Sequence, residues 1–230
     1  MPIAKELDDR LLSAISYLSP GCTVADIGTD HAYLPIALCQ RGICNRAVAC
    51  DVRPGPLASA KTHIAAAGLS DRIDTLLTDG LHGVEVYQPD FVLIFGMGGE
   101  LIARILSEAA WIRNADIGLV LQPMSRAEVL RGYLTENGFS ILGESLSRVE
   151  RLYQTIYARY TGQREHYTDA ELLVGKDRFL LSSPLAADLL QQRIRVLETV
   201  AAGKRAGGVL PNYEEALIAD LRKKGNMEVL

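Results

Sequence analysis

The chain has 230 residues, of which 48% are hydrophobic and 23% are charged, and its net charge is −4 at pH 7. This composition suits one or two globular domains with a sizeable core, and it excludes a protein that attracts nucleic acid through its overall charge. No segment approaches the ~20 apolar residues of a membrane-spanning helix, and residues 1–6 lack the apolar core of a signal peptide, so we expect a cytoplasmic protein without membrane contact.

Short apolar segments alternate with helical patterns over the first two thirds of the chain, which predicts a parallel sheet covered by helices on both faces. The predicted strands are 23–26, 46–51, 73–77, 91–95, 118–122, 139–148 and 151–160. The predicted helices between and before them are 7–18, 34–41, 56–67, 99–110 and 126–137. The last two strands can pair as an antiparallel hairpin across Val149 and Glu150, and the domain would end near residue 164.

Residues 165–230 have a different, helical pattern. Leucine and isoleucine recur at helical spacing within 184–204, Gly207-Gly208 interrupts the pattern, and a second helix is predicted from Pro211 to Lys224. Two such helices most simply form an antiparallel hairpin. The hairpin would hold a substrate, cover part of the core or mediate a dimer, and its nearly balanced charges do not by themselves favour RNA.

The four cysteines are predicted to be buried free thiols. Cys22, Cys39, Cys44 and Cys50 form no Cys-x-x-Cys pair, and no histidine is spaced with them as a zinc site would require. Cys22 and Cys50 lie in or beside predicted strands, where a free cysteine packs as a small apolar side chain. We therefore expect no metal site.

The most informative segment is 23–35, where a buried strand is followed by a glycine turn and a helix. A dinucleotide site needs Gly-x-Gly-x-x-Gly here, because the backbone must approach a pyrophosphate at a helix N-terminus. The chain has Gly28-Thr29-Asp30-His31-Ala32-Tyr33, so two glycines are missing and an acid is present. This pattern favours S-adenosyl-L-methionine, which has an ammonium, a sulfonium and no phosphate. The alternative is an ordinary strand-to-helix turn.

Three acids are predicted at the carboxyl ends of successive strands, the edge where open α/β sheets bind ligands. Asp26 would face the ammonium of the cofactor, or accept hydrogen bonds from the turn. Asp51, followed by Val52, would accept hydrogen bonds from ribose hydroxyls, which also fits NAD. Asp79, followed by Gly80, would reach the adenine amino group, or simply form a turn.

The next two strand ends would lie beside the transferred methyl group. Gly96-Met97-Gly98-Gly99 lets the backbone approach a ligand, or permits close packing of the strand on its helix. The Asn/Asp-Pro-Pro-aromatic motif of DNA amino methyltransferases does not follow this strand. In Gln122-Pro123-Met124, Gln122 offers a donor and an acceptor to a purine edge. Met124 would pack against a base or fill the core.

Together, Asp30-His31-Ala32-Tyr33-Leu34-Pro35, Gly96-Met97-Gly98-Gly99 and Leu121-Gln122-Pro123 resemble the bacterial tRNA adenine-N1 methyltransferases that act on position 22. The resemblance covers about residues 5–164 and continues weakly to the end. It implies an α/β fold, with a Rossmann-like seven-stranded class I methyltransferase sheet in residues 1–164 and a small C-terminal helical hairpin domain in 165–230. The chain departs from the family at Met124, where an asparagine is typical, and in its short hairpin.

The resemblance also implies the function, which is transfer of a methyl group from S-adenosyl-L-methionine to N1 of an adenine in tRNA. Asp30 would stabilise the methylated base or accept its proton, and Gln122 would hold the base edge. The expected cofactor-binding residues are Asp26, Gly28, Thr29, Asp30, His31, Ala32, Asp51, Val52, Asp79, Gly80, Gly96, Met97 and Gly98. The expected substrate-binding residues are Tyr33, Pro123, Met124 and Arg126.

Other functions share the same cofactor half. A class I methyltransferase of small molecules or proteins, or a homologue that binds cofactor or RNA without turnover, would show the same motifs, whereas an NAD-dependent oxidoreductase is disfavoured by the missing glycines. Arg126, Arg131, Arg148 and Arg151 would line the substrate side or form surface salt bridges. For the assembly we expect a monomer or a weak homodimer.

Overall fold

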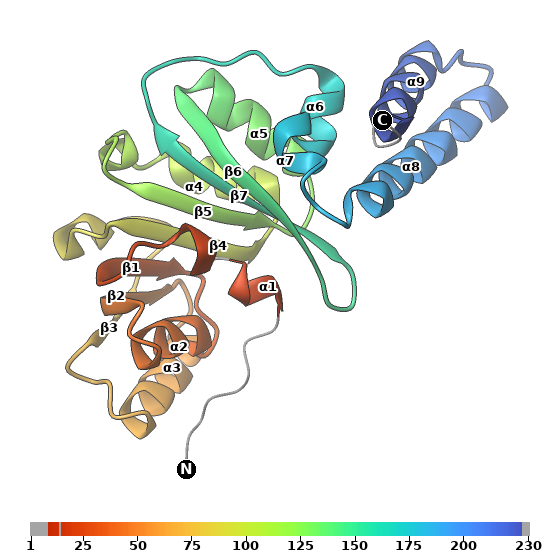
Figure 1. Cartoon of the computed structure of the whole chain (residues 1–230). Coiled ribbons are helices and arrows are strands. Elements are labelled where there is room, and N and C mark those ends of the chain that lie inside the picture. Colours follow the sequence, from red (N-terminus) through yellow and green to blue (C-terminus); the bar gives the residue numbers. More distant parts are fainter. Residues whose placement is uncertain (1–8, 14, 227–230) are drawn as a thin grey trace.

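The computed structural model describes residues 9–13 and 15–226, in which one mixed sheet carries helices on both faces and a helical region follows at the C-terminus (Figure 1). The strands are β1 (Cys22–Ile27), β2 (Cys44–Asp51), β3 (Ile73–Leu77), β4 (Phe91–Met97), β5 (Gly118–Pro123), β6 (Phe139–Arg148) and β7 (Leu152–Tyr160). Their order across the sheet is β3-β2-β1-β4-β5-β7-β6. Strands β1 to β5 are parallel, and β7 runs antiparallel to both β5 and β6. The predicted seven-stranded sheet and its final hairpin are confirmed.

Side-chain alternation along the central strands divides the sheet core into two layers. In β4, Val92 and Ile94 pack on one face while Leu93 and Phe95 pack on the other, because successive side chains of a strand point in opposite directions. The first face is covered by α4 (Gly99–Ser107) and α5 (Ala127–Glu136). The second face is covered by α1 (Asp9–Leu12), α2 (Tyr33–Gln40) and α3 (Pro54–Ala66). Three short 3-10 helices, Ile15–Tyr17, Val84–Tyr87 and Ala110–Ile112, lie between these elements.

The first helix is shorter than the predicted 7–18. Only α1 and the 3-10 turn Ile15–Tyr17 are present, and residues 7, 8 and 14 lie outside the described part of the chain. The Ser13 hydroxyl is 2.7 Å from both Arg10 O, to which it donates, and Thr155 Oγ1. A serine that bonds locally competes with the helical backbone and favours a helix end, so the helix stops here.

The C-terminal region contains the predicted antiparallel hairpin and two short helices that the sequence pattern did not reveal. The hairpin consists of α8 (Ala186–Ala206) and α9 (Asn212–Asn226), and the short helices are α6 (Asp169–Val174) and α7 (Asp177–Leu180). Lys204 pairs with Glu214, and Arg222 pairs with Glu198, as the antiparallel arrangement requires. A third apolar core joins these helices to the β6–β7 hairpin, and it contains Leu146, Leu152, Leu189, Leu190, Leu217 and Leu221.

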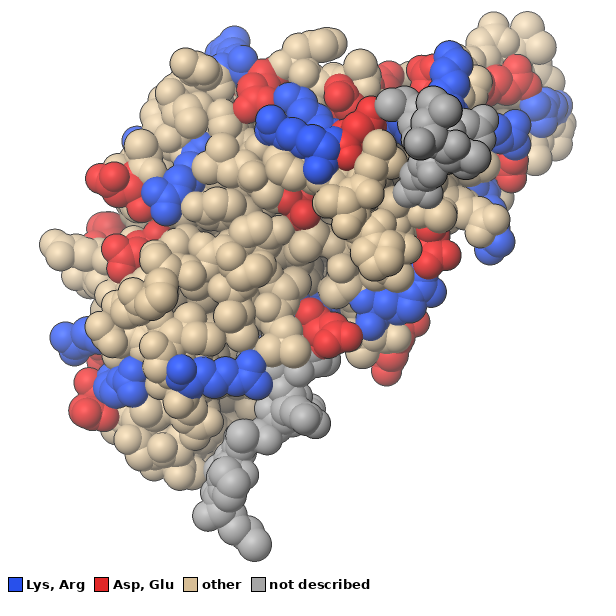
Figure 2. Space-filling view, viewed as in Figure 1, with Lys and Arg blue, Asp and Glu red and all other residues tan. Residues whose placement is uncertain are grey.

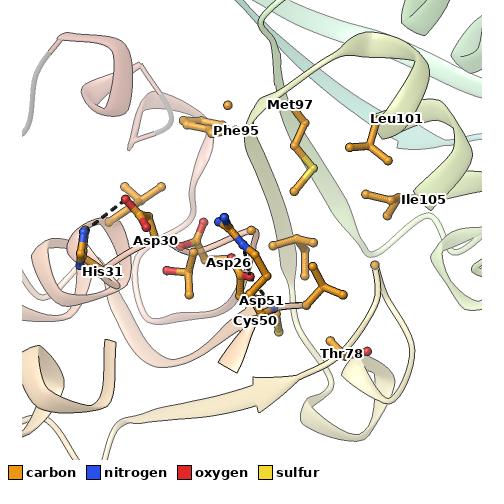
Figure 3. Close-up of a pocket in the computed structure, with 18 of the residues that line it drawn as sticks. Asp26, Asp30, His31, Cys50, Asp51, Thr78, Phe95, Met97, Leu101 and Ile105 are labelled. Atoms are coloured by element: carbon orange, nitrogen blue, oxygen red, sulfur yellow. Dashed lines mark hydrogen bonds and ion pairs between the residues drawn. The ribbon is translucent and has the colours of Figure 1, made fainter. Parts of the chain in front are cut away.

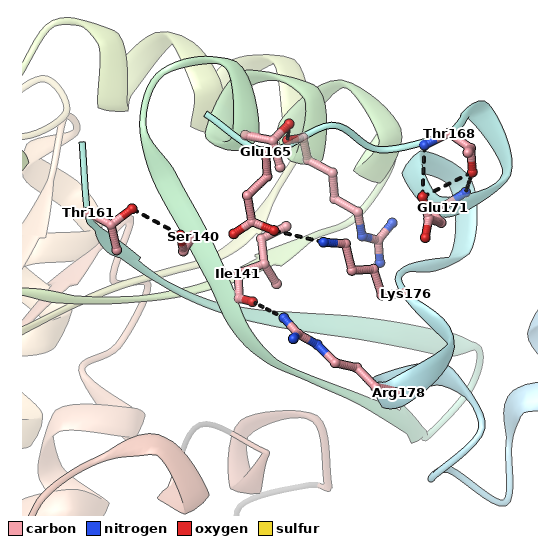
Figure 4. Close-up of polar contacts among 10 residues, drawn as sticks. Ser140, Ile141, Thr161, Glu165, Thr168, Glu171, Lys176 and Arg178 are labelled. Atoms are coloured by element: carbon pink, nitrogen blue, oxygen red, sulfur yellow. Dashed lines mark hydrogen bonds and ion pairs between the residues drawn. The ribbon is translucent and has the colours of Figure 1, made fainter. Parts of the chain in front are cut away.

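Polar contacts fix this helical region to the sheet. Lys176 Nζ lies 2.8 Å from Glu165 Oε2, and Arg178 Nη2 donates to Ile141 O at 3.3 Å. Figure 4 marks both contacts with dashed lines. In the same figure, Thr168 and Glu171 form a capping box that begins α6. The Arg178 contact ties α7 to β6, and the Lys176–Glu165 pair joins the start of α7 to the segment between β7 and α6.

A buried arginine lies beneath this junction. Arg131 of α5 is fully buried and donates to both carboxylate oxygens of Glu144 on β6, with a shortest distance of 2.5 Å. It also donates to Gln154 Oε1 and to Leu172 O, each at 2.8 Å. Because every described partner comes from a different element, Arg131 joins α5, β6, β7 and α6. Arg131 therefore does not form a surface salt bridge, which was one of the two roles predicted for it from the sequence.

Candidate functional site

A cavity of about 760 Å³ opens at the carboxyl ends of β1, β2 and β4 (Figure 3). From β1 the chain adds β2 and β3 on one side of the sheet and then β4 and β5 on the other, so the strand order reverses at β1. Open α/β sheets bind ligands at such a switch point. The volume lies within the range of small-molecule sites. Four carboxylates, those of Asp26, Asp30, Asp51 and Asp79, line it. The predicted convergence of the strand-end acids is therefore confirmed by the structure.

Asp26 places a buried carboxyl group in the cavity wall. The residue is 7% exposed, and burial raises its pKa to about 6. A hydrogen bond with the Thr29 side chain opposes this rise, while the nearby charge of Asp51 adds to it. A buried carboxylate is stabilised by a cationic ligand, so this position favours a molecule with a positively charged group.

Asp51 provides a second buried carboxylate at the end of β2. Its Oδ1 accepts a hydrogen bond from Arg53 N at 2.8 Å and lies 3.5 Å from Arg53 Nε. The residue is 6% exposed, yet it lines the cavity, so its carboxylate is held in place with one oxygen bonded to the following turn. Such an acceptor suits neutral hydroxyl donors of a ligand.

The glycine turn after β1 is drawn close to β2. The N–H groups of Gly28 and Thr29 both donate to Cys50 O at 2.8 Å. Gly28 has φ +80°, and a Cβ atom there would collide with the Met97 methyl group. Glycine at this position therefore satisfies both the left-handed backbone and the close approach of β4.

Asp30 lies at the open side of the cavity and touches a cluster of aromatic rings. Its side chain is 72% exposed, and its Oδ2 is 3.3 Å from His31 Nε2. Figure 3 marks this contact with a dashed line. The His31 ring centroid is 5.2 Å from that of Tyr33 and 5.3 Å from that of His63. His63 Nδ1 is also 3.2 Å from His31 O. The cluster fixes the orientation of His31 beside the exposed carboxylate.

Gln122 is not on the cavity wall. It is fully buried, and its Nε2 donates to Arg10 O at 3.0 Å and to Thr155 Oγ1 at 2.9 Å. Its Oε1 is buried with no hydrogen-bond partner in the described part of the chain. The amide thus joins α1 and β7 across the end of β5, and it does not face the cavity directly.

Most of the expected cofactor-binding residues line this one cavity. Of those thirteen, Ala32 and Gly98 are absent from the described lining of the cavity, and the rest are present. Ala32 is fully buried with φ 55°, and Gly98 is at the N-cap of α4. Among the expected substrate-binding residues, Tyr33 lines the cavity and Pro123, Met124 and Arg126 lie outside its described wall. Arg126 forms ion pairs with Glu100 and Glu128.

The structure adds lining residues that the sequence reasoning missed. They are Arg10, Leu11, Ile27, Leu34, Cys50, Arg53, Thr78, Phe95, Leu101, Arg104 and Ile105. Leu101 and Ile105 had a usable signal, since they follow the glycine turn at i and i+4 on one face of α4. Arg10 had none, because only the tertiary fold brings α1 to the sheet edge.

Three further findings concern the cysteines, metal-binding groups and membrane-spanning helices of the described residues. All four cysteines are buried and free, as expected, with Cys39 Sγ 3.1 Å from Cys44 Sγ. Over residues 9–13 and 15–226, no group of three or more His, Cys, Asp or Glu side chains is arranged to hold a metal ion. Within the same residues, no helix has the length and apolar character needed to cross a membrane.

Comparison with known proteins identifies clear relatives. Residues 7–156 match the family described as "Methyltransferase domain". The chain is 30% identical over 171 residues to the tRNA (adenine(22)-N(1))-methyltransferase of Bacillus subtilis, covering 74% of this chain and 72% of that protein. It is similar to Streptococcus pneumoniae Sp1610 in complex with S-adenosyl-L-methionine, with 31% identity and a TM-score of 0.82. The match covers 95% of this chain and 99% of the Sp1610 chain. It is also similar to M. capricolum TrmK in complex with S-adenosyl-homocysteine, with 26% identity and a TM-score of 0.78. That match covers 96% of this chain and 97% of the TrmK chain.

Proposed function

This chain belongs to the methyltransferase domain family and, within it, to the tRNA (adenine(22)-N(1))-methyltransferases, and we propose that it methylates N1 of an adenine in tRNA. S-adenosyl-L-methionine is its cofactor, since relatives are known in complex with this molecule and its product. The observation that carries the proposal is the buried Asp26 carboxyl group, in a cavity that three further acids share. This environment suits a cationic ligand without phosphate.

We assign the cofactor-holding roles by the chemistry of each strand end. Asp26 would bind the ammonium group, Asp51 would accept hydrogen bonds from the ribose hydroxyls, and Asp79 would accept one from the adenine amino group. Leu101 and Ile105 line the same cavity, and their apolar side chains would pack against the adenine ring. When bound, the cofactor supplies an electrophilic methyl group on a positively charged sulfur.

Asp30 is the proposed catalytic residue. Adenine N1 is on the base-pairing edge, so the nucleotide must leave its pairing partner to reach the cavity. The ring nitrogen is itself the nucleophile, and the methylated base carries a positive charge. The exposed carboxylate of Asp30, held beside His31, stabilises that charge or accepts a proton from the amino group. Most of the rate enhancement then comes from positioning.

Gln122 acts as a positioning residue in this account. Its amide nitrogen is bonded to Arg10 O and Thr155 Oγ1, so it holds α1 and β7 against the end of β5. The base edge is then met by residues that Gln122 supports. This role differs from the direct base contact expected from sequence.

The C-terminal region, residues 165–230, is the proposed second domain and an interaction element. Figure 2 shows basic and acidic side chains interspersed around the margin of one face, with a largely uncharged centre. This face therefore offers the uniformly negative tRNA local basic sites and not one broad basic surface. We expect the enzyme to act as a monomer or a weak homodimer.

Methyl transfer to unmodified tRNA tests the proposal. The protein is incubated with labelled S-adenosyl-L-methionine and transcribed tRNA, and the nucleosides are separated after digestion. The expected product is N1-methyladenosine. If the cofactor binds in calorimetry but no tRNA is methylated, the substrate is a small molecule or a protein, or the chain binds without turnover.

A further inference from the structure

Two arginines lie against one tyrosine ring at the start of β7. Arg10 Cζ is 5.6 Å from the centroid of the Tyr153 ring, and Arg151 Cζ is 5.3 Å from it. Both distances are within the range of cation–π attraction. Arg151 Nε also donates to Tyr153 Oη at 3.3 Å, and Arg151 Nη2 lies 3.6 Å from Met124 Sδ. We call these residues the Arg10–Tyr153–Arg151 cluster.

The cluster borders the cavity. Arg10 lines the cavity itself, and its carbonyl oxygen accepts the Gln122 hydrogen bond. Met124 N donates to Met97 O at 2.7 Å, and Met97 also lines the cavity. A nucleotide whose base enters the cavity would therefore keep its backbone close to the cluster.

Arg151 has only weak acceptors. In the described structure its guanidinium donates to a phenol oxygen and a thioether sulfur, and it forms no ion pair with Glu150 or any other described acid. The residue is exposed, and it shares the Tyr153 ring with Arg10, which lines the cavity. A guanidinium presents five donors in a fixed fork, and a phosphate group matches that geometry.

The other end of β7 provides an internal comparison. Arg159 Nε donates to Tyr157 Oη at 2.6 Å, and Arg159 Cζ lies 5.9 Å from the centroid of the Tyr157 ring. This arginine–tyrosine pair resembles the one formed by Arg151 and Tyr153. Arg159 Nη1, however, also donates to Ala115 O at 3.1 Å, which anchors its guanidinium to the protein. Among the described residues, the Arg151 guanidinium donates to no backbone carbonyl and so has no comparable anchor.

We propose that Arg151 and Arg10 bind a backbone phosphate of the RNA next to the adenine that enters the cavity, and that Tyr153 holds the two guanidiniums in place. The inference rests on the proposed function, and it names the part of the substrate that this edge of the site grips. Phosphate contacts set the position of a nucleic acid without reading its sequence. The cluster would therefore fix the depth to which the extruded nucleotide enters.

Titration of transcribed tRNA into full-length protein at several KCl concentrations tests this inference. Arg151→Gln should weaken tRNA binding about tenfold or more, because a charge-assisted hydrogen bond is lost. It should also reduce the slope of log Kd against log salt by about 0.7 to 0.9, the loss expected for one phosphate contact. Arg151→Lys should keep the slope and show a smaller loss, since it keeps the charge without the fork. Arg159→Gln is the matched control and should change neither quantity.

Each outcome decides the inference. Unchanged affinity and slope in Arg151→Gln would overturn it, as would an equal effect in Arg159→Gln. Loss of cofactor binding by calorimetry in both Arg151 variants would also overturn it, because the residue would then be structural. The wild-type protein is assayed for N1-methyladenosine in the same preparation. Failure of that assay refutes the proposed function, whereas the binding titration still reports on the Arg151 contact.

Discussion

Replacement of Asp26 by asparagine should stabilise the protein and abolish cofactor binding. Burial raises the pKa of Asp26 from 3.8 to about 6 in the folded state. The folded protein therefore holds this proton more tightly than the unfolded chain, and the contribution to stability falls as pH rises from about 4 to about 6. A shift of about two units corresponds to roughly 3 kcal/mol, the cost of the ionised group at neutral pH. Asp26→Asn removes that cost but loses the charge that faces the ammonium.

Urea unfolding between about pH 5 and about pH 8 measures this effect. The free energy of unfolding of Asp26→Asn should exceed that of the wild type by about 1 to 3 kcal/mol at pH 7.5, and the difference should shrink toward pH 5. Cofactor affinity of the wild type, measured by calorimetry, should fall as pH drops below about 6, because protonated Asp26 no longer attracts the ammonium. An Asp26→Asn protein that is less stable than wild type at every pH would refute this reasoning.

Three further predictions concern the same scaffold. Arg131→Ala should lower the free energy of unfolding by about 3 to 5 kcal/mol, because it leaves the buried Glu144 carboxylate unpaired. Arg131→Met combined with Glu144→Leu should lower it far less in the same urea denaturation experiment. Equal losses in the two proteins would contradict a buried ion pair. Gly28→Ala should lower the free energy of unfolding by about 1 to 2 kcal/mol, because residue 28 has a left-handed backbone. It should also weaken cofactor binding, measured by calorimetry, because the new methyl group would displace Met97 into the cavity. Unchanged cofactor affinity would contradict the close contact of Gly28 with Met97. Asp30→Asn should lower kcat at least about tenfold with cofactor affinity unchanged, and wild-type turnover at saturating cofactor would remove Asp30 from the mechanism.

The meeting of the acids in one cavity was predictable because these residues follow a local rule. Asp26, Asp51 and Asp79 each lie at or just after the carboxyl end of a strand whose apolar pattern is readable, and parallel strands bring their carboxyl ends to one edge. The turn at Gly28 was equally readable, since missing glycines distinguish it from a dinucleotide site. Where sequence position dictates spatial position, the sequence is sufficient.

The substrate side was less predictable because it depends on contacts between distant segments. Gln122 is polar and ends a strand, which indicates a site residue, but its bonds to Arg10 and Thr155 form only in the folded chain. The helices α6 and α7 are too short to show a helical period. The hydroxyl group of Ser13, which follows the last residue of α1, forms a hydrogen bond with the hydroxyl group of Thr155, 142 residues away in the sequence. Such features belong to tertiary structure.

The most direct test of the central claim compares two tRNA transcripts that differ only at position 22. One carries adenine there, as in the substrate named for the Bacillus subtilis relative, and the other carries guanine. Initial rates of methyl transfer are measured with nucleoside identification. We expect N1-methyladenosine from the adenine transcript and none from the guanine transcript. Absence of N1-methyladenosine from both transcripts, while the protein binds S-adenosyl-L-methionine, would contradict it.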